Sequence, residues 1–211
     1  MKWLFALFSS SIGKKQLMAL TGLCLIFFLI VHLVGNFTLF MGEEPFNEYA
    51  KFYSDHPKLL LVAEAGLVTL FLVHIFLAIR VTLQNRSARP QAYVAKDASD
   101  ATLASRTMIF TGFVILSFLI WHLIMFKFSE PENLYEAVSS VFRLPLVAGA
   151  SAIAMFLLGF HLNHAIKSLL QTFGFDHPNY TPLTKCLGFI ISLFIGIGFA
   201  LIPLYFILMK G

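Results

Sequence analysis

Histidine is the residue type in this chain whose placement could support chemistry. Five of the seven histidines lie inside long apolar stretches, namely His32, His74, His122, His161 and His164, whereas His56 and His177 lie between such stretches. Ionisable side chains at membrane depth are rare and generally functional. A single one could be a neutral ring bonded to a neighbouring helix. One in each of four consecutive stretches indicates a shared role.

These histidines occur at matching depths. His32, His74 and His122 each follow the start of their apolar run by 15 residues, and His161 follows its own by 17. In a helix this places each ring ~22–25 Å from the start of its run. Because successive spans alternate in direction, His32 and His122 should lie near one membrane face, and His74 and His161 near the other. The sequence predicts two pairs of imidazoles, ~15 Å apart along the membrane normal.

Paired imidazoles in a dry helix bundle suit haem better than zinc. Zinc usually needs four ligands, and the spans contain few other polar groups. A haem needs only axial ligands from the protein, and two imidazoles fill both positions, which leaves one-electron transfer as its chemistry. No C-x-x-C-H motif occurs, so we predict two non-covalent b-type haems. His32 and His122 would ligate the iron of the outer haem, and His74 and His161 that of the inner haem.

Spacing and depth disagree about the ligand in the fourth span. An interval of 42 residues separates His32 from His74, and the same interval separates His122 from His164, which favours His164. Depth favours His161, because His164 would lie ~30 Å along its helix, at the membrane interface. We prefer His161 and keep His164 as an alternative ligand. Otherwise His164 would contact a haem propionate or extend its ring to the interface.

The elements that must position these histidines are membrane spans. Of the 211 residues, 58% are hydrophobic and only 12% are charged, about half the charged fraction of a soluble domain. Apolar runs of about 20 to 25 residues are long enough to cross ~30 Å of hydrocarbon as helices. Lipid offers no hydrogen-bond partners for the backbone of an extended chain, so these runs must be helical. We predict an all-α membrane protein, one domain over 1–211, with an interfacial segment at 1–13 and five transmembrane helices at about 17–41, 59–83, 105–127, 144–169 and 186–209.

The distribution of basic residues predicts the orientation of this bundle. Ten lysines and arginines fall on the side of the N-terminus and five on the other side, where seven of the eleven acidic residues also lie. Cytoplasmic loops of membrane proteins carry the excess of Lys and Arg. We therefore expect the N-terminus to be cytoplasmic and the C-terminus external. The net charge of +4 then reports topology, and we expect no nucleic acid partner.

Several short motifs around the histidines resemble one family. They are HLVGN at 32–36, VHIFLA at 73–78, IWH at 120–122, and FHLNH at 160–164 followed by FG at 173–174. Together they resemble the dihaem cytochrome b subunit of succinate dehydrogenase and quinol:fumarate reductase, the complex II family. The similarity covers nearly the whole chain. In that family the fourth ligand maps to His161.

The resemblance implies a membrane anchor with an electron-transfer role. A flavoprotein subunit and an iron–sulfur subunit would dock on the cytoplasmic side, where succinate or fumarate reacts. This chain would bind menaquinone and pass electrons between the quinone and the iron–sulfur subunit. Such a complex resides in the cytoplasmic membrane of a prokaryote, in contact with lipid. Both directions, succinate oxidation in the tricarboxylic acid cycle and fumarate reduction in anaerobic respiration, use the same parts.

Quinone chemistry needs proton transfer, for which the sequence offers few candidates. Glu64 is the one carboxylate inside a span and is either a proton-transfer group near the outer haem or a solvated glutamate at the interface. Asn36 and Glu48 are weaker candidates for the quinone site. Basic residues near the inner level could pair with haem propionates, although topology alone also explains them: Lys14, Lys15 and Arg80.

Two other functions compete with this interpretation. Another dihaem membrane cytochrome b is possible, but the bc type carries two histidines on each of two helices, whereas here each helix contributes one. A proton-coupled transporter would use the histidines and Glu64 as a relay without haem, and it would be expected to show inverted repeats or broken helices. The sequence shows no convincing inverted repeat. A reduced-minus-oxidised absorption spectrum separates the haem proteins from the transporter.

Overall fold

Five long apolar helices form the molecule. The computed structural model describes residues 10–87, 100–129, 131–175 and 177–209, and for 100–106 the backbone only. In this part of the chain the structure is helical, with no strand. The elements are α2 (Ser11–Asn36), the 3₁₀ helix η1 (Phe37–Met41), α3 (Glu43–Ser54), α4 (Pro57–Ser87), α5 (Asp100–His122), the π-helix η2 (Leu123–Lys127), α6 (Leu134–Phe142), α7 (Pro145–Thr172) and α8 (Thr181–Leu208).

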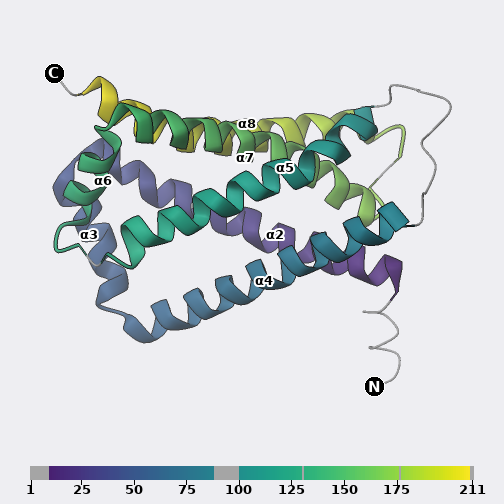
Figure 1. Ribbon diagram of the computed structural model, residues 1–211, viewed down its shortest axis with the longest axis horizontal. Helices are drawn as coiled ribbons and strands as arrows, with labels where there is room; N and C mark the ends of the chain where they lie inside the picture. Colours follow the sequence, from purple (N-terminus) through teal and green to yellow (C-terminus); the bar gives the residue numbers. More distant parts are fainter. Residues whose placement is uncertain (1–9, 88–99, 130, 176, 210–211) are drawn as a thin grey trace.

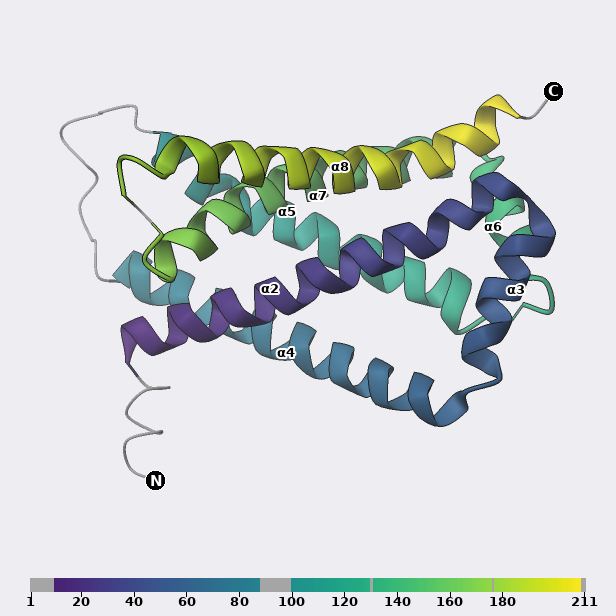
Figure 2. The ribbon, with the colours of Figure 1, turned by 180° about the vertical axis from the view of Figure 1, so that it is seen from behind.

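The prediction of five spans in an all-α fold is confirmed. Five helices are long and apolar enough to cross a membrane: α2 with η1, α4, α5 with η2, α7 and α8. They run along the long axis of the molecule, and α2 crosses the others obliquely (Figures 1 and 2). The start of α2 and the end of α8 lie at opposite ends of this axis (Figure 2), as an odd number of spans requires.

The helices extend beyond the predicted spans at one end of the bundle. α2 begins at Ser11, α4 continues to Ser87, α5 begins at Asp100 and α8 begins at Thr181. Hydropathy marks only the apolar part of a helix, whereas backbone hydrogen bonding continues through polar turns. At the start of α2, Ser10 Oγ accepts a hydrogen bond from the Gly13 amide at 2.9 Å. Of the predicted interfacial segment, 11–13 therefore belong to α2, and 1–9 lie outside the described residues.

Four of the spans surround the interior in the order α4, α2, α7, α5. α4 packs on α2, α2 packs on α7, and α7 packs on α5, while α8 packs along α7 and also touches α2. The contact between α7 and α8 is close because small residues meet there: a Cβ on Gly196 would lie 3.0 Å from the Cα of Gly159. Small residues at such contacts let helix backbones approach in lipid, where hydrophobic burial gives little drive to association.

The two short helices α3 and α6 cover one end of the bundle, which we call the α3/α6 end (Figure 1). Polar side chains join them: Asn47 donates to Asn133 Oδ1 at 2.9 Å, and Asn133 donates to Glu43 Oε1 at 2.6 Å. Beneath them, Phe46 and Phe142 are buried against the last turns of α8. Hydropathy alone did not predict these helices, because only one face of each is apolar.

Candidate functional site

His32 and His122 face each other near the α3/α6 end. His32 lies one turn before the end of α2, and His122 is the last residue of α5. Their ring centroids are 6.0 Å apart, with the ring planes at 86°. Each ring stacks on the phenylalanine four residues earlier, Phe28 at 5.2 Å and Phe118 at 5.8 Å. The helical period places these stacked partners on the same helix face.

His74 and His161 occupy the corresponding place toward the other end. His74 lies in the second half of α4 and His161 in the second half of α7. Each ring is held by a threonine from another helix. His74 Nδ1 lies 3.1 Å from Thr21 Oγ1 of α2, and His161 Nδ1 lies 3.1 Å from Thr111 Oγ1 of α5.

Both histidine pairs come from helices at diagonally opposite corners of the bundle. In the order α4, α2, α7, α5, the helices of His32 and His122 are opposite, and so are those of His74 and His161. Diagonal helices run in the same direction, so a pair shares one depth. The interior between them is therefore bordered by two imidazoles at each of two levels.

The helices that carry these residues share an internal sequence repeat. Residues 21–32 read TGLCLIFFLIVH and residues 111–122 read TGFVILSFLIWH, so that threonine, glycine, phenylalanine and histidine recur at the same positions. Residues 74–80, HIFLAIR, correspond to 161–167, HLNHAIK. This alignment equates His74 with His161 and leaves His164 without a counterpart. Thr21 and Thr111 were not among the predicted site residues, although the repeat in the sequence could have identified them.

His164 lies one turn beyond His161 on α7 and has different surroundings. Lys167 follows His164 by three residues on α7 and aligns with Arg80 in the repeat. Arg80 is exposed and lies over the Phe76 ring at 5.7 Å. Of the lysines proposed for propionates, Lys14 is half-buried and Lys15 is exposed.

Glu64 is neither buried nor unpaired. It lies in the second turn of α4 at the α3/α6 end and forms an ion pair with Lys127 of η2 at 2.5 Å. The two side chains are 37% and 45% exposed, respectively. The pair connects α4 with the π-helical turn that follows His122. Lys127 was not among the predicted site residues, because its partner is 63 positions away in the sequence.

The remaining quinone candidates also lie at the α3/α6 end. Asn36 donates to the His32 carbonyl at 2.8 Å, and its Nδ2 is 3.4 Å from each ring nitrogen of His32. Glu48 is exposed on α3. Tyr49, which sequence analysis did not single out, lies against Gly35 and shares a hydrogen bond with Tyr53 at 3.2 Å. Burial, together with the Tyr53 hydroxyl, raises the pKa of Tyr49.

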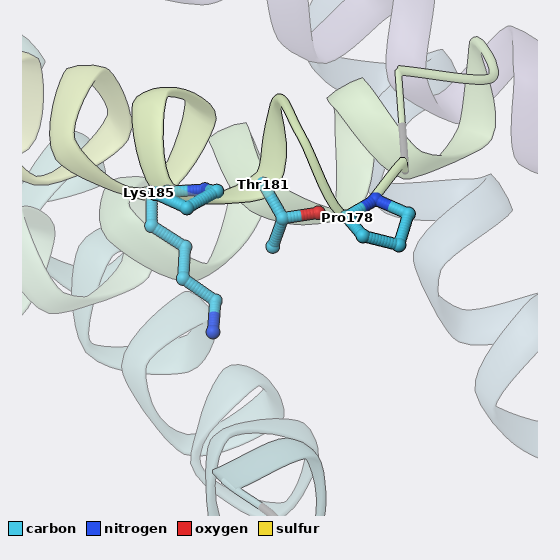
Figure 3. A pocket seen from close by; sticks show the side chains of 4 residues that line it. Pro178, Thr181 and Lys185 are labelled. Atoms are coloured by element: carbon cyan, nitrogen blue, oxygen red, sulfur yellow. The ribbon is translucent and has the colours of Figure 1, made fainter.

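A shallow hollow lies at the start of α8, at the end of the bundle opposite α3 and α6. Pro178, Thr181, Pro182 and Lys185 line it (Figure 3). It contains none of the predicted site residues, and the paired histidines lie elsewhere in the bundle.

Comparison with known proteins identifies the family. A family model described as the succinate dehydrogenase/fumarate reductase transmembrane subunit matches residues 82–199. The match covers more than half of the chain, from the last turns of α4 to most of α8. The chain belongs to this family. No curated protein and no solved structure matches it.

Membership in the succinate dehydrogenase/fumarate reductase family makes the chain a membrane-anchoring subunit of an oxidoreductase complex. It is a multi-pass membrane protein that associates with the other subunits of that complex. The matched region contains His122 and His161. His32 and His74 precede it, and the internal repeat relates them to the matched pair.

Proposed function

We propose that this subunit binds two b-type haems and carries electrons between a membrane quinone and an iron–sulfur subunit. The observation that supports the proposal is the arrangement of four histidines as two pairs, each from diagonal helices. His32 and His122 would hold one haem iron near the α3/α6 end. His74 and His161 would hold the other nearer the opposite end.

The spacing of the His32 and His122 rings fits two imidazoles that would hold one iron. Two metal–imidazole bonds of about 2 Å each, plus the distance from nitrogen to ring centre, would separate the ring centres by about 6 Å. The His32–His122 separation of 6.0 Å agrees with this spacing. At the other level, Nδ1 of each histidine already has a hydrogen-bond partner, which leaves Nε2 for a metal. When bound, haem with two imidazole ligands supplies one-electron transfer and has no open coordination site.

The end that carries Lys14, Lys15, Arg80 and Lys167 would be cytoplasmic, in line with the excess of basic residues. A flavoprotein and an iron–sulfur subunit would dock there, beside the His74–His161 pair. These four basic residues are also the candidates to pair with haem propionates. The bundle would lie in the cytoplasmic membrane of a prokaryote.

The quinone, proposed to be menaquinone, would bind at the α3/α6 end. His32, Asn36 and Glu48 lie on the elements that form this end, together with the Glu64–Lys127 pair. Glu64 is half-exposed, so it can exchange protons with water while its charge is balanced by Lys127. We propose that Glu64 transfers protons to or from the bound quinone.

A spectrum of the purified complex tests the proposal. We expect a b-type band in the reduced-minus-oxidised spectrum, two haems per chain by extraction, and a flavoprotein with an iron–sulfur protein in its mass spectrum. A colourless complex would contradict haem binding and favour a transporter. Two haems in the absence of those partners would instead indicate a dihaem cytochrome of another type.

A further inference from the structure

Two threonines contact the histidines proposed to hold the inner haem. We infer that Thr21 and Thr111 are positioning residues that fix the tautomer and ring orientation of His74 and His161, so that each Nε2 faces the bundle interior. The inference rests on the proposed haem-binding function. It concerns residues that neither the family match nor the histidine spacing singles out.

The hydrogen-bond geometry favours the histidine ring nitrogen as the donor. Thr21 Oγ1 lies 3.0 Å from the carbonyl oxygens of Leu17 and Met18, and 3.1 Å from His74 Nδ1. A hydroxyl has one hydrogen, and carbonyls can only accept. In a helix that hydrogen goes to the carbonyl three or four residues earlier. The Thr21 oxygen therefore accepts a hydrogen bond from Nδ1–H of His74, and Nε2 keeps its lone pair for a metal.

The same geometry occurs a second time. Thr111 Oγ1 lies 2.9 Å from the Thr107 carbonyl and 3.2 Å from the Met108 carbonyl, with His161 Nδ1 at 3.1 Å. Thr21 and Thr111 are each only 4% exposed, so these internal partners replace water. Two segments 90 residues apart build one contact, which argues for a shared role.

A glycine next to each threonine makes room for the ring. A Cβ on Gly22 would lie 3.3 Å from His74 Cε1, and a Cβ on Gly112 would lie 3.6 Å from His161 Cε1. The Thr-Gly pair thus gives the imidazole both a hydrogen-bond acceptor and a flat surface against the helix. It lets the ring of one helix lie directly on the backbone of the next.

The contacts distinguish the two proposed haems. Both ligands of the inner haem donate to a threonine. At the outer level, by contrast, His32 meets the Asn36 side-chain amide, whose nitrogen is equally far from both ring nitrogens. A hydrogen bond from the second ring nitrogen raises the basicity of a ligating histidine, which favours oxidised iron. Removing either threonine hydroxyl should therefore raise the midpoint potential of the inner haem and leave that of the outer haem unchanged.

The test is a redox titration of both haems in the assembled complex, followed optically. Thr21→Val and Thr111→Val keep the shape and remove the hydroxyl, while Thr21→Ser keeps a hydroxyl. Thr69→Val is the matched control: Thr69 Oγ1 donates to the Ala65 carbonyl of α4 at 2.8 Å and is exposed. His161→Ala should lack the inner haem, so the midpoint potential that remains in this variant belongs to the outer haem. The potential that is lost then belongs to the inner haem.

We expect a positive shift of the inner potential in each valine variant, a larger one in the double variant, and wild-type values for Thr69→Val and Thr21→Ser. Loss of only the inner haem from Thr21→Val, with both haems kept in Thr21→Ser, also supports the inference. Potentials in the valine variants that match those of Thr69→Val would overturn it, as would equal effects of serine and valine at position 21. Absence of haem from the wild-type complex would instead refute the proposed function.

Discussion

His32 and His122, 90 positions apart in the sequence, lie with their ring centroids 6.0 Å apart. Both rings lie near the α3/α6 end, on diagonally opposite helices of the bundle. Phenylalanines stack on the two rings in the same way, four residues before each histidine. This correspondence gives the two histidines of the proposed outer haem site equivalent supports. The predictions below follow from the proposed pairing of the four histidines.

Replacing His122 with alanine should remove the outer haem and spare the inner one. The His122 ring is one of the two proposed axial ligands at that level, and His32 alone cannot fill both positions. The measurement is the haem content per chain, which should fall from two to one, together with a redox titration that retains a single component. Two haems per chain in this variant would show that the pairing is wrong.

His161→Ala and His164→Ala should differ sharply. His161 contacts Thr111 and aligns with His74 in the repeat, whereas His164 lies one turn further along α7. We expect His161→Ala to lose the inner haem and His164→Ala to keep both. Pyridine haemochrome spectra of the two variants give the comparison. The opposite result would assign the iron to His164, in agreement with the equal 42-residue intervals.

Alanine should be tolerated at position 112 better than at position 22. A methyl on Gly22 would lie 3.3 Å from His74 Cε1, so the ring must move by a few tenths of an ångström, whereas the 3.6 Å at Gly112 is an ordinary contact. We expect Gly22→Ala to shift the spectrum of the inner haem or to lower its occupancy, and Gly112→Ala to match the wild type. Equal effects at both positions would argue against close ring packing at Gly22.

Glu64→Gln should slow quinone turnover by about 100-fold if the carboxylate transfers protons, while succinate still reduces the haems at the wild-type rate. Lys127→Met is the control, because it breaks the same 2.5 Å ion pair but keeps the carboxylate. We expect it to retain most of the turnover. Equal losses in both variants would mean that the ion pair acts by joining α4 to η2, and that Glu64 has no role in proton transfer.

Gly35→Ala should destabilise the α3/α6 end. A Cβ at this position would overlap the Tyr49 ring, and overpacking of this kind costs about 1–3 kcal/mol. We expect a lower melting temperature for Gly35→Ala and partial recovery in the double variant with Tyr49→Ala. Gly66→Ala serves as the control, because no atom lies within 4 Å of its added Cβ. A melting temperature for Gly35→Ala equal to that of Gly66→Ala would exclude the contact.

The sequence alone determined the five spans and the position of each histidine along its span. Long runs without charge, such as the one that contains His32, must become helices in lipid, since no other local structure satisfies the backbone there. A fixed rise per residue then converts position in the run into depth. These are properties of single segments, and they do not depend on which helices are neighbours.

Tertiary structure decided how the helices meet. Every face of a membrane helix is apolar, so hydropathy does not show which face packs inward, and small residues and hydrogen bonds select it instead. The contacts of Thr21 with His74, of Thr111 with His161 and of Glu64 with Lys127 each join helices more than 45 residues apart. Only the packed bundle brings such groups together, because their proximity depends on the rotation of each helix about its own axis.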